Sequence, residues 1–158
     1  MPERSPFEYV VIRVMPRVDR GEFVNAGVML ICRPHRFLGA RMQLDRRRVK
    51  ALDPTLSDPE LAAIEEQLAQ LCAIAHGEPA AGSLAGLSPG ERWHLLSAPT
   101  STVVQPSPVH TGLCVDPAAE LDSLFAELVP VLPRSGDPAN QPARDKPETD
   151  IARDPITS

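Results

Sequence analysis

Two long runs of β-branched and aliphatic residues near the N-terminus, joined by a short charged turn, restrict the fold of this chain most strongly. The first run, Glu8–Met15 (EYVVIRVM), is followed by Pro16, and the second, Phe23–Cys32 (FVNAGVMLIC), follows a turn that contains Gly21. Such runs predict a β-hairpin. Because the first run is polar at few positions, we expect it to form a central strand with both faces covered.

Two further strands are expected from the same kind of signal. Residues Phe37–Leu44 follow the turn sequence RPHR and alternate apolar with polar or small residues, which is typical of a strand with one buried and one solvated face. The first three strands therefore predict an antiparallel meander. Thr102–Gln105 predicts a fourth strand, and the two prolines after it confine the following residues to an edge or a loop.

Helices are predicted by capping patterns in front of apolar stripes. Ser57-Asp58-Pro59-Glu60 is a capping-box sequence, and the helix behind it ends before Gly77. Ser88–Glu91 repeats the pattern before a short helix that carries Trp93, and Asp116-Pro117 opens a last helix. The residues between the third strand and the first helix, Asp45–Ser57, are expected to form a polar connection.

The sequence thus predicts one α+β domain over residues 1–133, in which two to three helices pack on a small antiparallel sheet. Residues 134–158 contain no aromatic residue and only two Ile among repeated Pro, Asp, Arg and Ala, so they predict a disordered Pro-rich tail. No apolar run approaches the ~20 residues that span a bilayer. No secretory signal is visible at the N-terminus, so we expect a cytoplasmic protein with no membrane partner and with reduced thiols at Cys32, Cys72 and Cys114.

Charge is distributed unevenly along the chain, whose net charge is −5. The first 50 residues carry 11 of the 16 Lys and Arg residues and five of the 21 Asp and Glu residues, a net charge of +6, and the remainder carries −11. Two readings stay open. A basic sheet and acidic helices neutralise each other after folding, or the folded protein presents two faces of opposite sign to a partner.

The hairpin carries a specific pattern, Tyr9, Arg13 and Pro16 followed by Arg-Gly-Glu-Phe-Val-Asn-Ala-Gly-Val over residues 20–28. This pattern resembles the opening of the DUF3037 family, a bacterial family of unknown function, and the segment Asp116–Phe125 is similar to that family's C-terminal helix. The resemblance covers roughly residues 7–129. It implies no established activity, and it implies a gene neighbourhood with kinase-like proteins of the HipA type, hence a protein partner of that kind.

The turn of this hairpin is the first candidate site. Its candidate ligand- or partner-binding residues are Arg13, Arg17, Arg20, Glu22 and Asn25. Several guanidinium groups and a carboxamide on one loop suit a phosphate or carboxylate. The alternative is structural: Gly21 supplies a positive φ, Gly27 marks a bulge or a close backbone approach, Asn25 bonds the turn backbone, and the charged residues form a small ion-pair network.

The basic segment 33–50 is a second candidate, for binding nucleic acid through phosphate contacts. Its candidate residues are Arg33, Arg36, Arg41, Arg46, Arg47, Arg48 and Lys50. The acidic balance, the pI of 5.3 and the aromatic content of 4% oppose this reading, because stacking platforms for bases are scarce. A solvated loop, or a cap on an acidic surface, is the alternative.

Motifs for the common enzyme classes are missing from the sequence. It contains no P-loop, no dinucleotide-binding glycine pattern, no G-x-S-x-G and no metal-ligand pairing of histidines, so we expect no catalytic triad, no metal and no cofactor. The sequence therefore favours a non-catalytic interaction protein, an accessory or regulatory subunit. Nucleic-acid binding is the alternative, and an enzyme or binder of a small anionic ligand at the Arg20–Asn25 loop is a third.

Overall fold

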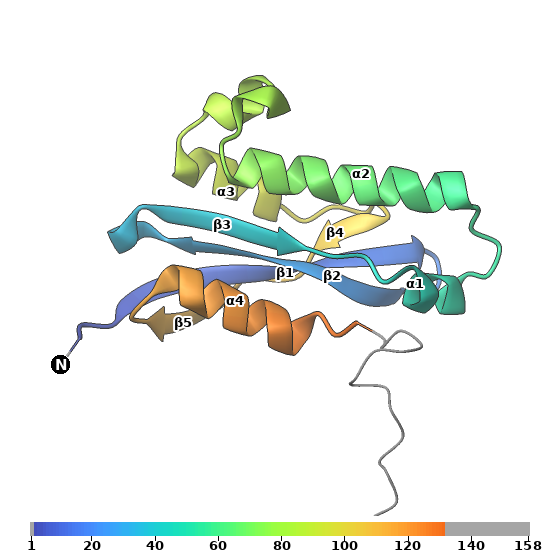
Figure 1. Ribbon diagram of the computed structural model, residues 1–158, viewed down its shortest axis with the longest axis horizontal. Helices are drawn as coiled ribbons and strands as arrows, with labels where there is room; N and C mark the ends of the chain where they lie inside the picture. Colours follow the sequence, from blue (N-terminus) through green and yellow to red (C-terminus); the bar gives the residue numbers. More distant parts are fainter. Residues whose placement is uncertain (1, 132–158) are drawn as a thin grey trace, which may run out of the picture.

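The computed structural model describes residues 2–131, and the predicted disordered tail over 134–158 lies outside them. The described chain is α+β, with one antiparallel sheet of five strands (Figure 1). Strand β1 (Ser5–Arg17), β2 (Glu22–Cys32) and β3 (Phe37–Met42) form the predicted meander. Two shorter strands, β4 (Val104–Pro106) and β5 (His110–Cys114), pair in succession with the other edge of β1.

A β-bulge in β2 shifts which residues face which side of the sheet. Ile12 pairs with Gly27 but Arg13 pairs with Asn25, so Ala26 is the extra residue. Val24 and Ala26 before the bulge share a core cluster with Met29 and Ile31 after it, while Val28, Leu30 and Cys32 lie in the cluster on the opposite face. A Cβ at Gly27 would overlap Met42 Sδ and lie 2.8 Å from the Arg41 carbonyl oxygen. The prediction for Gly27 is confirmed in both its forms, bulge and close approach.

Helices cover both faces of the sheet. On one face lie α2 (Asp58–Ala75) and α3 (Pro89–Ser97), and α4 (Pro117–Leu128) lies on the other (Figure 1). The core on the α2 face includes the buried Trp93, as the sequence predicts, and Val49 of the short helix α1 (Arg46–Leu52). The core on the α4 face joins Phe7, Leu30 and Cys32 to Leu121 and Phe125. Strand β1 is therefore buried from both sides along much of its length.

Local capping fixes where the helices begin. Capping boxes are present at Ser57 with Glu60 and at Ser88 with Glu91, and the Asp116 side chain accepts from the amides of Ala118 and Ala119. The backbone after α2 reverses at Gly77, which has φ +69°. These features agree with the sequence predictions, because each depends on contacts within a few residues.

One sequence expectation was wrong and two were displaced. The predicted polar connection contains α1, which begins after the N-cap Asp45. The residues after Pro108, expected at an edge or in a loop, form the edge strand β5. The fourth strand, predicted for Thr102–Gln105, occupies Val104–Pro106, and β3 ends at Met42 instead of Leu44. Short 3₁₀ turns at Arg33–His35, Pro79–Ala81 and Ser83–Gly86 complete the described chain.

Candidate functional site

The tip of the β1–β2 hairpin is a tight turn that depends on Gly21. The amides of Arg20 and Gly21 donate to the carbonyl oxygens of Arg17 (3.0 Å) and Val18 (3.3 Å). Gly21 has φ +70°, a left-handed conformation that a Cβ would strain. The turn therefore requires glycine for backbone reasons, independently of any binding role.

Charged residues at the tip are already paired with one another. Arg17 Nη2 lies 3.0 Å from Asp19 Oδ2, and Arg20 Nε lies 3.3 Å from Glu22 Oε1, with about half or more of each side chain exposed. The hydrogen bond from Arg17 lowers the pKa of the Asp19 carboxyl below its usual value. Exposed pairs of this kind contribute about 0–1 kcal/mol to stability, so they give the tip its charge pattern rather than its fold.

The other two predicted residues of this site lie away from the tip, on the sheet face that α4 covers. The Arg13 guanidinium sits 4.2 Å from the centroid of the Phe23 ring, and its buried Nε has no hydrogen-bond partner in the described chain. Asn25 Nδ2 donates to the Leu128 carbonyl oxygen at 2.9 Å. The expectation that Asn25 bonds the turn backbone is therefore corrected: its amide joins β2 to the C-terminal end of α4.

Asp53, which the sequence reasoning passed over, lies behind the tip at the end of α1. Its Oδ1 accepts from the Thr55 amide (3.1 Å) and hydroxyl (2.6 Å), which lower the pKa of the buried carboxyl, and the charges of Arg17 and Arg20 lower it further. The signal in the sequence is the Asp-Pro-Thr spacing, since Asp commonly bonds the amide two residues later.

Two apolar side chains are partly exposed at the hairpin tip. Val18, between Arg17 and Asp19 in the chain, is 43% exposed, and Phe23, next to Glu22, is 41% exposed beside the Arg13 guanidinium. We call this surface, residues 17–23, the hairpin tip. It carries two partly exposed apolar side chains and charged groups of both signs.

Segment 33–50, the candidate nucleic-acid site, is divided between distant parts of the sheet. Arg33 and Arg36 lie at the β2–β3 connection, whereas residues 46–50 form α1 at the opposite end (Figure 1). Arg33 pairs with Glu8 (3.2 Å), and Arg41 pairs with Asp122 (3.0 Å) and stacks on Phe125. For Arg36, which is exposed, the structure shows no ion pair within residues 2–131.

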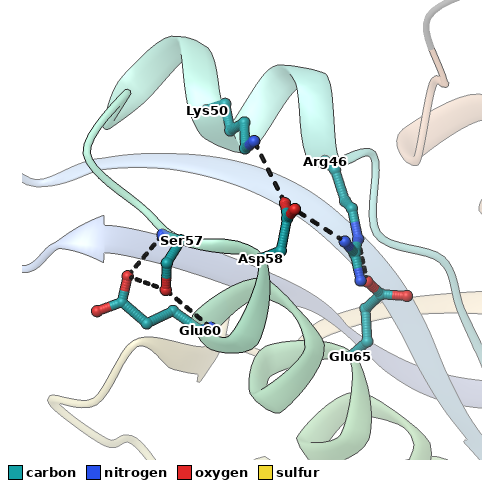
Figure 2. Close-up of polar contacts among 6 residues, drawn as sticks. All are labelled: Arg46, Lys50, Ser57, Asp58, Glu60 and Glu65. Atoms are coloured by element: carbon teal, nitrogen blue, oxygen red, sulfur yellow. Dashed lines mark hydrogen bonds and ion pairs between the residues drawn. The ribbon is translucent and has the colours of Figure 1, made fainter.

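Two of the cations of α1, Arg46 and Lys50, are directed at the first turns of α2. Figure 2 shows Arg46 between Asp58 (3.9 Å) and Glu65, and Lys50 on the other side of Asp58 (3.5 Å). Arg47 pairs with Asp45 (3.9 Å), and Arg48 donates to the Pro130 carbonyl oxygen (2.8 Å). Arg41, Arg46 and Lys50 thus pair with carboxylates of the later chain, which neutralises part of the charge asymmetry. Segment 33–50 is divided and largely paired, so it does not form one contiguous basic surface.

The described chain also contains a hollow between β3 and α2 and three thiols. The hollow, of about 500 Å³, contains none of the predicted site residues; it is lined by Met42, Gln43, Leu44, Glu65, Leu68, Ala69, Cys72, Ala73 and Glu78. All three cysteines are free, and burial raises the pKa of the Cys114 thiol to about 11, with the Cys32 thiol beside it. No group of three metal-ligating side chains occurs in the described part of the chain.

The comparisons with known proteins give one match. The model of the family described as "Protein of unknown function (DUF3037)" matches residues 9–129. The chain belongs to the DUF3037 family. The match begins at Tyr9 on β1 and ends at Val129 just after α4, so the DUF3037 region includes all five strands at least in part. No curated protein and no solved structure is significantly similar to the chain.

No helix within residues 2–131 is long and apolar enough to cross a membrane. That finding agrees with the absence of a long apolar run in the sequence.

Proposed function

We propose that this DUF3037 protein is a non-catalytic interaction protein that binds a protein partner through its hairpin tip. The observation that supports this most is the exposure of Val18 and Phe23 on a short segment that also carries the ion-paired residues Arg17, Asp19, Arg20 and Glu22. Apolar side chains at the centre and polar groups at the edge are the usual anatomy of protein interfaces.

The balance of charge at the tip favours a protein over a polyanion. Arg17 and Arg20 each have a carboxylate within 3.3 Å, so a phosphate chain would have to displace Asp19 and Glu22. A protein surface can instead exchange pairs with both signs while it covers the two apolar side chains. The same argument reduces the support for a small anionic ligand or an enzyme substrate at the Arg20–Asn25 loop.

We further propose that the role is that of an accessory or regulatory subunit in the cytoplasm. A kinase-like protein of the HipA type is the first partner to test, because the family resemblance implies such a neighbour. The tip lies at the end of the longest hairpin, on the side of the sheet's end where α1 is found (Figure 1).

Affinity capture from the native host tests this proposal. We expect a stoichiometric protein partner with the wild-type chain and its loss with a Val18→Ser, Phe23→Ser double variant. The matched control is Leu84→Ser, which removes a similarly exposed apolar side chain on a 3₁₀ turn far along the chain. Recovery of no partner by the wild-type chain, or equal recovery by the double variant, would refute it. Circular dichroism of each variant verifies that it is folded.

Nucleic-acid binding through segment 33–50 stays a prediction with weaker support. Arg33, Arg41, Arg46 and Lys50 have acidic partners in the domain. Fewer cations are therefore free to contact phosphates and release the counterions of the nucleic acid. Titration with single-stranded and duplex oligonucleotides at 50 mM salt, repeated at higher salt, tests it. Binding whose affinity falls steeply with salt would support this function.

A further inference from the structure

Strand β5 leaves one edge of the sheet open. The Val11 amide donates to Ser107 Oγ (2.8 Å) and its carbonyl accepts from the Ser107 amide (2.7 Å), so the odd-numbered residues of β1 direct their backbone groups toward β4 and β5. The β5 residues that pair with the odd-numbered residues of β1 are His110, Gly112 and Cys114. By the alternation of a strand, the N–H and C=O groups of Thr111 and Leu113 point away from the sheet.

The side chains along this edge are uncharged and partly apolar. Val109 is 48% exposed, Leu113 is 61% exposed and Val115 is 46% exposed. Leu113 lies within β5, and Val109 and Val115 are the residues directly before and after the strand, all at odd positions. A chain extended over residues 109–115 places the three on one face. Residues 109–115 (VHTGLCV) include no Lys, Arg, Asp or Glu, the residues that usually protect an edge strand from pairing.

The opposite edge of the sheet, at β3, is protected by α2. Its Ala40 amide donates to His76 Nε2 (3.1 Å), and its carbonyl accepts from Cys72 Sγ (3.5 Å). Exposed Arg36 and Arg41 flank this position. The two edges therefore differ: side chains of this domain satisfy the backbone at the middle of β3, and within residues 2–131 no strand pairs with the outer side of β5.

We infer that β5 pairs antiparallel with β5 of a second copy of this chain, which continues the sheet across a two-fold axis at Gly112. Thr111 of one copy then lies opposite Leu113 of the other, and Val109 lies opposite Val115. The outward backbone groups of these residues become mutual hydrogen-bond partners, and six apolar side chains gather on one face. Gly112 lies opposite itself, where the absence of a side chain permits the close approach of a non-hydrogen-bonded pair.

A second copy fits this edge for reasons of charge and length. Because residues 109–115 are uncharged, an identical strand brings no like charge against them. The length of the paired segment is limited at both ends of the dimer strand by the same two residues. Pro108 has no N–H to donate, and it lies opposite Asp116 of the other copy, where α4 begins. The dimer uses the open edge of each copy and leaves the protected β3 edge outside, so assembly stops at two chains.

This surface is separate from the hairpin tip. Strand β5 pairs with Ser5–Tyr9, and the tip begins at Arg17, eight residues farther along β1, or about 26 Å at the rise of an extended chain. Dimerisation and partner binding are therefore independent properties, and each can fail without the other.

Sedimentation velocity of the full chain between 2 and 200 µM tests the inference. We expect a monomer–dimer equilibrium for the wild-type chain and at least a tenfold weaker dimer for Leu113→Lys, because the two charges meet across the axis. Leu84→Lys, at another exposed apolar position, should dimerise as the wild type does. A wild-type monomer at 200 µM, or an unchanged dimer for Leu113→Lys, overturns the inference.

Disulfide trapping tests the register. A Val109→Cys, Val115→Cys chain should form a covalent dimer under mild oxidation, because these positions lie opposite each other across the axis. Within one chain they are six residues apart, about 20 Å along an extended strand, too far for a disulfide. The experiment uses a Cys72→Ala background, since Cys72 is the one native thiol that is not buried. Failure to cross-link when sedimentation shows a dimer overturns the β5 register.

Discussion

Replacing Asn25 by Ala is the sharpest test of how the hairpin signature stabilises the fold. The Nδ2 group of Asn25 is a half-buried donor to the Leu128 carbonyl oxygen, 2.9 Å away, at the last turn of α4. Its loss leaves a helix-terminal acceptor facing a methyl group, which costs about 1–2 kcal/mol in a partly buried setting. For a domain of about 130 residues, this corresponds to a fall in Tm of roughly 4–8 °C.

Thermal unfolding followed by circular dichroism measures this change. The matched comparison is Glu22→Ala, which removes an exposed partner of Arg20 and should alter the free energy of unfolding by less than about 0.5 kcal/mol. Amide exchange adds the location: in Asn25→Ala we expect faster exchange in the last turn of α4 and unchanged exchange in α2. A Tm within 1 °C of the wild type for Asn25→Ala would refute the reasoning that this amide anchors α4.

Three further predictions follow from the packing and the titrating groups. Gly27→Ala should lower the free energy of unfolding by about 1–3 kcal/mol, because its Cβ overlaps Met42 Sδ, whereas Gly86→Ala meets open space and should be nearly neutral in urea unfolding. The pKa of Asp53 is lowered in the folded state, so its stabilising contribution is present above the unfolded pKa near 4 and is lost as the pH falls through the folded pKa. Asp53→Asn should therefore reduce the fall in the free energy of unfolding at acidic pH. An unchanged pH dependence would contradict this. Alkylation under native conditions should modify Cys72 before Cys114, whose thiol is buried and whose pKa is about 11, and equal rates would show that β5 opens readily.

Local features of this protein were readable from the sequence. The hairpin, the Gly21 turn, the bulge at Gly27 and the capping boxes at Ser57 and Ser88 were predicted because each depends on residues within a few positions of one another. Helix α1 was missed because a seven-residue segment rich in Arg and Lys buries one residue, Val49, and so has almost no apolar periodicity.

Strand β5 illustrates what only tertiary structure decides. Residues His110–Cys114 follow Pro108 and contain Gly112, so their intrinsic preference for a strand is low. They are extended because β1, about 100 residues earlier in the chain, offers unpaired backbone groups at Ser5–Tyr9. The prolines limited this segment to an edge or a loop, but a partner so distant in sequence leaves no local signal that it pairs with β1.

The candidate sites divide in the same way. The sequence by itself determined which residues carry charge, where the turn lies and that the hairpin has a family-specific pattern. Tertiary structure alone decided that Asn25 bonds α4, 103 residues away, and that Arg41 pairs with Asp122. The physical reason is that hydrogen bonds and ion pairs depend on distance in space, and only the packing of helices on the sheet brings these groups within 3 Å.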